Sequence, residues 1–304
     1  MDVTDSGSKP KHDLRAVASE FRIPGRCVSG APYGSGHIND TYAVVFEENG
    51  GSVRYILQRV NHVVFNDVPA VMENIERVTK HVRRVLEQTL PADRVDDIDR
   101  RTLTLVPTHD AAVYHRDARG NYWRCYLFIE GARTYDRIED PAMAYQGARG
   151  FGAFQRMLTD LPGGPLHETI PAFHDTRSRF EALKTAIADD AAGRAKAVQA
   201  EIDFALRHEE TAGRLLDLLA AGELRELTTH NDTKLNNVMI DDGTGEAVCV
   251  IDLDTVMPGL PLYDFGDMVR SATNTGAEDD TNLDNVWMDM AIFEQLARGY
   301  LAAT

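Results

Sequence analysis

Three polar residues near the end of the chain have the types and the spacing of a phosphoryl-transfer site. His230, Asp232 and Asn237 form the pattern H-x-D-x-x-x-x-N, and an apolar run then leads to Asp252. Transfer of a phosphoryl group asks little covalent chemistry of a protein, so positioning and charge neutralisation dominate. An H-x-D triplet occurs by chance in many chains. Its combination with the later asparagine and aspartate is specific, and it predicts phosphoryl transfer.

Each residue type suits one task in that chemistry. Asp232 is short and ionised at neutral pH, so we assign it as the catalytic base that orients a substrate hydroxyl and accepts its proton. Asn237 offers a neutral oxygen and Asp252 a charged one, a donor set that suits Mg²⁺ beside phosphate oxygens. Asp254 is a further candidate metal ligand, and its alternative role is to stabilise the turn. We expect His230 to brace the loop backbone.

The segment YDFGD at 263–267 resembles a metal-binding triplet, but its position argues against that role. Asp264 lies far beyond Asn237 and follows Pro258 and Pro261, whereas the apolar run that would deliver a metal ligand ends at Asp252. We therefore expect Asp264 to be structural. It either caps the helix that begins near it or bonds the catalytic loop.

Composition bounds the class of protein. A chain of 304 residues can bury a large core and form two lobes, and its hydrophobic fraction of 43% and charged fraction of 26% are typical of globular proteins. The net charge of −16 argues against nucleic-acid and anionic-membrane partners, which need basic surface. The three cysteines have no metal-ligand spacing and fit buried thiols in a reducing compartment.

The N-terminus and the apolar runs bear on location. Residues 1–13 are polar and contain no apolar core of a signal peptide, and no run is long enough to cross a bilayer. We assign residues 1–20 to a flexible N-terminal tail that includes the start of a short helical segment at 14–21. The expected location is the cytoplasm.

The first half of the chain is rich in strand patterns. Alternation predicts strands at 26–31, 41–46 and 53–60. The loop between the first two contains Gly34 and Gly36, which would let the backbone close over phosphates without a Cβ in the way. A plain hairpin loop explains these glycines nearly as well.

A helix and two further strands are predicted next. Apolar residues at helical spacing span 68–86, and Glu73 or Glu76 on this helix could reach the third strand. Strands are predicted at 103–106 and 122–129. The second ends in LFIEG, a candidate hinge that contains Phe128 and Glu130 and whose backbone would pair with adenine. Helical patterns dominate beyond the hinge, at 142–157, 177–188, 197–220 and 287–301.

Several segments resemble the phosphotransferase family that includes aminoglycoside phosphotransferases and choline kinases, and within it the bacterial N-acetylhexosamine 1-kinases. These segments are YGSGHINDTY (33–42), YILQRVN (55–61), AFHDTRSRFE (172–181), THNDTKLNN (229–237) and IDLDTVMPGLPLYDFGD (251–267). The resemblance implies an α+β, two-lobed protein-kinase-like fold. It would have a nucleotide-binding N-lobe at 21–130 and a helical C-lobe at 131–304.

The resemblance also implies an activity and its ligands. ATP and Mg²⁺ would be the cofactors, and the anomeric hydroxyl of N-acetylglucosamine or N-acetylgalactosamine the acceptor. Nucleotide contacts are expected from one set of residues: Gly34, Ser35, Gly36, Gln58, Glu76, Phe128 and Glu130. Sugar contacts are expected from His37, Asn39 and Asp232. The alternative for His37 and Asn39 is that they only stabilise the hairpin loop.

Two departures from the family pattern leave alternatives open. Gln58 stands where protein kinases have the third-strand lysine that grips the phosphates, and this leaves the phosphate contact unassigned. Relatives continue past the position of Thr304 into a helical segment that supplies an arginine to the sugar pocket. We therefore expect either a C-terminally truncated chain or a sugar site closed differently. The alternatives are a kinase of an amino alcohol or aminoglycoside, and an inactive kinase-like protein.

Overall fold

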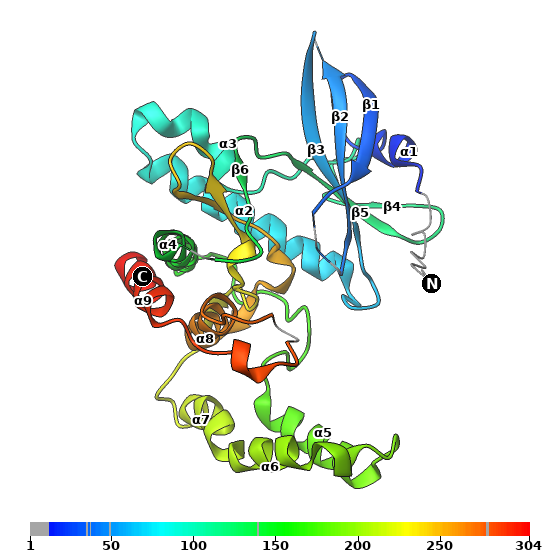
Figure 1. The fold of residues 1–304 in the computed structure, drawn as a ribbon. Helices are drawn as coiled ribbons and strands as arrows, with labels where there is room; N and C mark the ends of the chain where they lie inside the picture. Colours follow the sequence, from blue (N-terminus) through cyan, green and yellow to red (C-terminus); the bar gives the residue numbers. More distant parts are fainter. Residues whose placement is uncertain (1–11, 35, 37, 49, 139, 278–279) are drawn as a thin grey trace, which may run out of the picture. The chain divides into compact units, whose positions relative to one another are not determined.

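The computed structural model describes residues 12–34, 36, 38–48, 50–138, 140–277 and 280–304. Contacts divide the chain into two compact units (Figure 1). The first unit consists of Met1–Tyr135 and Asn236–Asp254, and the second of Asp136–Leu235 and Thr255–Thr304. The chain therefore leaves the first unit, returns to it for nineteen residues, and leaves it again.

Among its described residues, the first unit contains two antiparallel sheets and three α-helices. One sheet has the strand order β1-β2-β3-β5-β4, and the other the order β6-β8-β9. Its strands are β1 (Arg26–Pro32), β2 (Asp40–Glu48), β3 (Gly51–Val60), β4 (His115–Arg116), β5 (Tyr122–Leu127), β6 (Ala132–Arg133), β8 (Val238–Asp241) and β9 (Ala247–Val250). Its helices are α1 (Leu14–Ala18), α2 (Val68–Thr89) and α3 (Ile98–Arg101).

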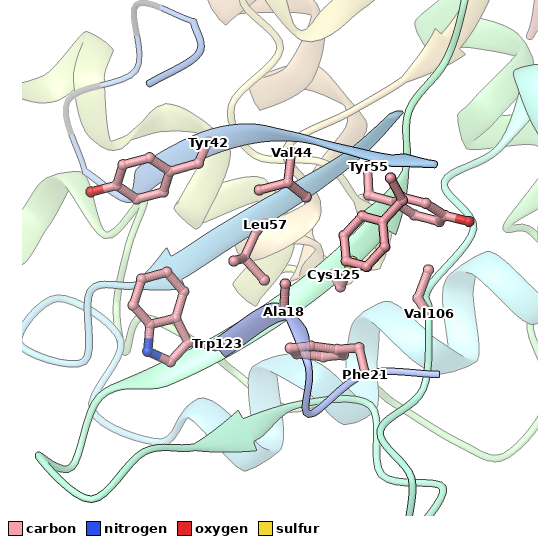
Figure 2. Close-up of a cluster of buried hydrophobic side chains, with 10 residues drawn as sticks. Ala18, Phe21, Tyr42, Val44, Tyr55, Leu57, Val106, Trp123 and Cys125 are labelled. Atoms are coloured by element: carbon pink, nitrogen blue, oxygen red, sulfur yellow. The ribbon is translucent and has the colours of Figure 1, made fainter. Parts of the chain in front are cut away.

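Alternating side chains of the five-stranded sheet form the core of the first unit. Val44, Leu57 and Cys125 are fully buried on one face of the sheet, and Ala18 and Phe21 pack against them from α1 and the segment after it (Figure 2). The period-2 pattern of the sequence places these residues on one face because successive strand side chains point to opposite sides. Helix α1 thus belongs to the core, so the predicted flexible tail at 1–20 extends too far.

The second unit is built mainly from helices. These are α4 (Pro141–Met157), α5 (Thr176–Asp189), α6 (Gln199–Arg207), α7 (Glu209–Ala220), α8 (Pro261–Ala272) and α9 (Met290–Ala303), with a short pair of strands, β7 (Leu227–Thr229) and β10 (Met257–Gly259). None of the helices in the described parts of the chain is both long and apolar enough to span a membrane. A strand-rich first unit and a helical second unit agree with the predicted α+β class.

Two predicted elements differ from the structure. Residues 103–106 do not form a strand; Leu105 makes only an isolated bridge to Tyr126, and Pro107, which has no N–H to donate, follows immediately. The helix predicted at 197–220 is broken at His208. There the imidazole Nδ1 lies 2.8 Å from the carbonyl oxygen of Phe204, and the chain starts a second helix.

Helices α4 and α9 pack closely because glycines face the partner helix. A Cβ on Gly299 would lie 2.1 Å from the carbonyl oxygen of Tyr145, a distance no real contact allows. A Cβ on Gly152 would lie 2.8 Å from the carbonyl oxygen of Tyr300. The backbones themselves are therefore in contact, and side chains cannot absorb an added methyl group.

We predict that Gly299→Ala lowers the stability of the protein by roughly 1–3 kcal/mol, the usual cost of overpacking a tight core. The matched control is Gly266→Ala in α8, where an added Cβ meets nothing within 4 Å. That change should leave stability equal or raise it by up to about 1 kcal/mol, since alanine is the better helix former. Thermal unfolding followed by circular dichroism measures both. Equal melting temperatures for the two variants would contradict the prediction.

Candidate active site

The β8–β9 hairpin of the first unit brings two predicted metal ligands to the same place. Val238 pairs with Val250 across the hairpin, and the N–H of Ile251 donates to the carbonyl oxygen of Asn237 at 2.9 Å. Asn237 immediately precedes the first strand, and Asp252 follows the second by two residues. The antiparallel pairing therefore places Asn237 and Asp252 at one end of the hairpin.

The backbone at Asp252 has an uncommon conformation. Its φ is +57°, in the left-handed region, which non-glycine residues rarely adopt and which aspartate tolerates better than most. Leu253 after it is 3% exposed and anchors the turn, while Asp252 itself is exposed. The strained position thus holds a solvent-accessible carboxylate at the end of a buried strand.

The donor set at this end of the hairpin fits Mg²⁺. Asn237 carries an amide oxygen and Asp252 an exposed carboxylate. Across the described parts of the chain, no group of three or more histidine, cysteine, aspartate or glutamate side chains is placed to hold a metal. A site of one carboxylate and one amide suits Mg²⁺, which keeps water and phosphate oxygens as its other ligands.

Asp254, the third predicted metal ligand, is engaged by the protein. It is 2% exposed, its Oδ1 forms an ion pair with Arg124 Nη1, and its Oδ2 accepts a hydrogen bond of 2.7 Å from Asn39 Nδ2. Both carboxylate oxygens therefore already have a donor. This geometry favours the structural interpretation of Asp254 over the second metal contact.

Gln58, in the lysine position of the third strand, is likewise held on both sides. Its Nε2 donates to Thr41 Oγ1 at 2.9 Å, and its Oε1 accepts from Arg124 Nε at 2.8 Å. Glu76, predicted to reach this strand from the helix, instead pairs with Lys80 on the next turn of α2 at 2.6 Å. Arg124 thus lies beside Gln58, the position at which protein kinases have the lysine of a lysine–glutamate pair.

The glycine loop lies between β1 and β2, closed at its base by a 2.9 Å hydrogen bond from Tyr33 N to Thr41 O. Gly34 has a φ of +80°, and a Cβ on Gly34 or Gly36 would meet nothing within 4 Å. Its backbone is thus open on that side, as a phosphate-binding loop requires. Two predicted contact residues, Ser35 and His37, lie outside the described residues.

Asn39 closes the other end of the loop. It is 9% exposed, and besides donating to Asp254 it accepts a 2.9 Å hydrogen bond from the N–H of Asn61 through its Oδ1. Both the nitrogen and the oxygen of the Asn39 side-chain amide are therefore hydrogen-bonded to other residues of the first unit. This geometry favours the alternative in which Asn39 stabilises the loop.

The segment predicted as a hinge is tied into the first unit by two arginines. Arg54 pairs with the Glu130 carboxylate and lies over the Phe128 ring, with its Cζ 3.8 Å from the ring centroid. Arg100 donates to the carbonyl oxygens of Glu130 at 2.9 Å and Gly131 at 3.0 Å. The structure thus places Phe128 and Glu130 side by side, with the Glu130 carboxylate and carbonyl already bonded.

The first part of the predicted catalytic loop, from His230 to Leu235, belongs to the second unit and is fixed by Asp264. The Asp264 carboxylate accepts hydrogen bonds from the backbone N–H groups of His230 at 2.9 Å and Asn231 at 2.8 Å. Its carbonyl oxygen accepts from Thr233 Oγ1 at 2.6 Å. Of the two structural roles expected for Asp264, bonding the catalytic loop is the one observed. Burial raises the pKa of Asp264 to about 6, against the two backbone hydrogen bonds that favour its ionised form.

Two histidines complete the support of this loop. His230 is 1% exposed, packs edge-on against Phe151, and its Nδ1 accepts a 3.3 Å hydrogen bond from the N–H of Asp232. His174 Nε2 lies 3.1 Å from the carbonyl oxygen of Asn231, and burial lowers the pKa of His174. A neutral His174 that donates from Nε2 satisfies this contact. Asp232 is thus a half-buried residue on a loop that its neighbours hold rigid.

Arg124 is the residue that the sequence analysis missed. The signal was present, since an arginine inside the apolar run YWRCYLF is a charge in a strand that should be buried. Its partners could not be foreseen, because the pairing of Gln58 with Arg124 depends on the register of β3 and β5.

Solved structures with similar architecture show a kinase-like fold. An aminoglycoside phosphotransferase from Alicyclobacillus acidocaldarius superposes with a TM-score of 0.61 at 15% identity, covering 98% of this chain and 80% of that one. A microcompartment-associated aminopropanol kinase gives 0.55 at 18% identity, covering 95% and 80%. A spectinomycin phosphotransferase in complex with ADP and spectinomycin gives 0.54 at 12% identity, covering 96% and 80%.

The sequence gives independent evidence of ancestry. Residues 29–301 match the profile of a family described as "Phosphotransferase enzyme family", a span that includes the glycine loop, the predicted hinge, the predicted catalytic loop and the β8–β9 hairpin. This match identifies the chain as a member of the phosphotransferase enzyme family, in agreement with the kinase-like fold.

Proposed function

We propose that the chain is an ATP- and Mg²⁺-dependent kinase that phosphorylates the anomeric hydroxyl of an N-acetylhexosamine. The observation that carries the phosphotransfer part is the β8–β9 hairpin, which sets Asn237 and Asp252 at one end, with Asp232 only five residues before Asn237 in the chain. Membership of the phosphotransferase enzyme family supports the same chemistry.

In this proposal each residue acts through its own oxygen atoms. Asp232 orients the acceptor hydroxyl and takes its proton as the oxygen attacks the γ-phosphorus of ATP, while the bond to the β,γ-bridging oxygen breaks and ADP leaves. Asn237 and Asp252 would hold Mg²⁺, which supplies neutralising charge to the phosphates when it is bound. Holding the attacking group and the cation in fixed positions accounts for most of the catalysis that a protein can offer this reaction.

We assign the nucleotide to the first unit. The open backbone at Gly34 and Gly36 supports a phosphate-facing loop, because N–H groups without a nearby side chain can approach an anion closely. The backbone around Phe128 is the proposed contact for adenine. Gln58, Glu76 and Glu130 have protein partners for their side chains, which supports giving them positional roles rather than direct contacts.

The acceptor is assigned by resemblance to the N-acetylhexosamine 1-kinases. The same five segments carry that resemblance, and those at 229–237 and 251–267 are the most specific. The proposed sugar contacts are His37 and Asp232, with Asn39 holding the loop. A hydroxyl-rich acceptor needs several fixed polar groups, each of which is left unpaired when a hydroxyl is missing.

We predict that Asp232→Asn lowers turnover by about 10²–10⁴-fold, the range expected when a general base is removed. Affinity for nucleotide should stay within about twofold of wild type, because Asp232 lies on the acceptor side of the reaction in this proposal. Initial rates and the binding of ADP by calorimetry give the two quantities. Near-normal turnover in this variant would remove the assignment.

We predict different effects for two aspartates. Asp252→Asn should abolish turnover and weaken Mg·ADP binding while the melting temperature in the absence of ligand changes little, because its side chain is exposed and asparagine tolerates the left-handed backbone at this position. Asp264→Ala should lower that melting temperature, because two backbone N–H groups lose their acceptor in a buried place. Thermal shift with and without Mg·ADP separates these effects. A stable Asp264 variant that lacks only its response to Mg²⁺ would mean that the metal ligand has been assigned to the wrong aspartate.

We predict that N-acetylglucosamine or N-acetylgalactosamine is converted to its 1-phosphate, whereas the matched 1-deoxy sugar gives no product. Release of ADP across a panel of sugars, choline, ethanolamine and kanamycin, followed by ³¹P NMR of the product, makes the measurement. Phosphate on C6 would overturn the substrate assignment. Phosphorylation of choline, ethanolamine or kanamycin, with no turnover of any hexosamine, would overturn it too. Release of no ADP with any acceptor would support the inactive kinase-like alternative.

A further inference from the structure

Arg124 is a fully buried cation in the middle of the five-stranded sheet. The residue is 1% exposed, and its guanidinium contacts the carboxylate of Asp254, the amide of Gln58 and, at 3.9 Å from Nη1, the sulfur of Met72. Burial works against the charged form, but the nearby Asp254 carboxylate holds the pKa of Arg124 above its ordinary value. Removing a guanidinium from water is unfavourable, so a folded protein retains it only where an anion and hydrogen-bond acceptors contact it.

The position of this cation relates it to the lysine that the third strand lacks. In protein kinases a lysine on that strand pairs with a helix glutamate, and the pair must be in place for activity. Here Gln58 on β3 is the direct cross-strand partner of Arg124 on β5. The positive charge therefore lies on the strand next to the one that carries the lysine in protein kinases. The helix acid Glu76 is bonded to Lys80, and the counterion is Asp254.

Asp254 connects this cation to the candidate metal site. It lies two residues after Asp252, on the same turn, and its second oxygen binds Asn39 at the end of the glycine loop. A continuous chain of contacts therefore runs from Gln58 through Arg124 and Asp254 to Asn39. The chain joins β3 and β5 to both the glycine loop and the turn that carries Asp252, all within the first unit.

We propose that Arg124 is a positioning residue that replaces the third-strand lysine by holding Asp254, and thereby fixes Asp252 and the glycine loop for Mg²⁺-nucleotide. Asp254 serves Arg124 as its counterion and is not a metal ligand. This inference rests on the proposed function, because it assigns nucleotide and metal to the first unit. It goes beyond the proposed function because it places the positive charge of the absent third-strand lysine on β5. There the charge acts on Mg²⁺-nucleotide only through Asp254.

The test compares nucleotide binding with and without the metal in variants of the full chain. Arg124→Met should weaken the binding of Mg·ADP by about 10–100-fold, the usual effect of losing a residue that orients a metal ligand. Binding of ADP in the presence of a chelator should weaken much less, because Arg124 acts through the turn of Asp252. Arg124→Lys should recover part of the loss, since it restores a cation that can reach a carboxylate. Isothermal titration calorimetry measures each dissociation constant.

Two further variants separate positioning from folding. Arg124→Met leaves the Asp254 carboxylate buried without its cation, and this alone can destabilise the fold. The single variant is therefore compared with the double variant Arg124→Met/Asp254→Asn, which removes both charges. The double variant should regain melting temperature over the single one but not regain affinity for Mg·ADP. The control is Arg101→Met, which loses a half-buried pair with Asp97 in the same unit and should change only the melting temperature.

Each outcome decides a different point. A double variant that binds Mg·ADP as wild type does would show that the pair is only structural, and would overturn the inference. Equal weakening of ADP with and without Mg²⁺ would show a direct phosphate contact in place of positioning, and would overturn it too. A wild-type chain that binds no Mg·ADP would instead overturn the proposed function, and with it the assignment on which this inference rests.

Discussion

A guanidinium buried inside a β-sheet constrains everything around it. Arg124 must have an anion at contact distance, and Asp254 supplies it from the turn after β9. Since the carboxylate is then committed to the sheet, the turn cannot move without leaving a bare charge in a dry interior, which costs far more than the loss of a surface ion pair. Gln58 accepts a hydrogen bond from Arg124 Nε, and Asn39 donates one to the second oxygen of Asp254, so the strand and the loop share the same constraint.

The second unit reaches a similar result by other means. Its predicted catalytic loop is fixed instead by backbone N–H groups that donate to the carboxylate of Asp264. Asn231 adopts a φ of +66° and remains in place because its side-chain amide donates to the carbonyl oxygen of Thr255 at 3.0 Å. Positive φ values thus occur at Asn231 beside Asp232 and again at Asp252, which is where precise placement of a side chain is worth some backbone strain.

Much of this architecture follows from local pattern. Alternating apolar residues predicted β2 and β3, and an apolar face at helical spacing predicted α2, because each pattern buries one face of its element. The roles of Asp254 and Asn39 could not be predicted in the same way. Their partners lie far away in the sequence, and which of two plausible roles a carboxylate takes depends on whether a cation reaches it. Gln58 shows the same limit, since the sequence revealed that a lysine was absent but not that an arginine on another strand lay opposite.

The return of residues 236–254 to the first unit affects how the protein is made. Strand β8 pairs with β6, and Met239 and Cys249 fill a small core with Ile129 and Ala132. On the ribosome, that core stays open while the hundred residues from Asp136 to Leu235 are synthesised, so the nascent chain exposes apolar surface until the hairpin emerges. Pairing over such a sequence distance is slow to form. Because each unit consists of two separate segments of the chain, cleavage at one peptide bond would not release either unit intact. Neither unit can therefore be expressed by itself as one uninterrupted segment of this chain.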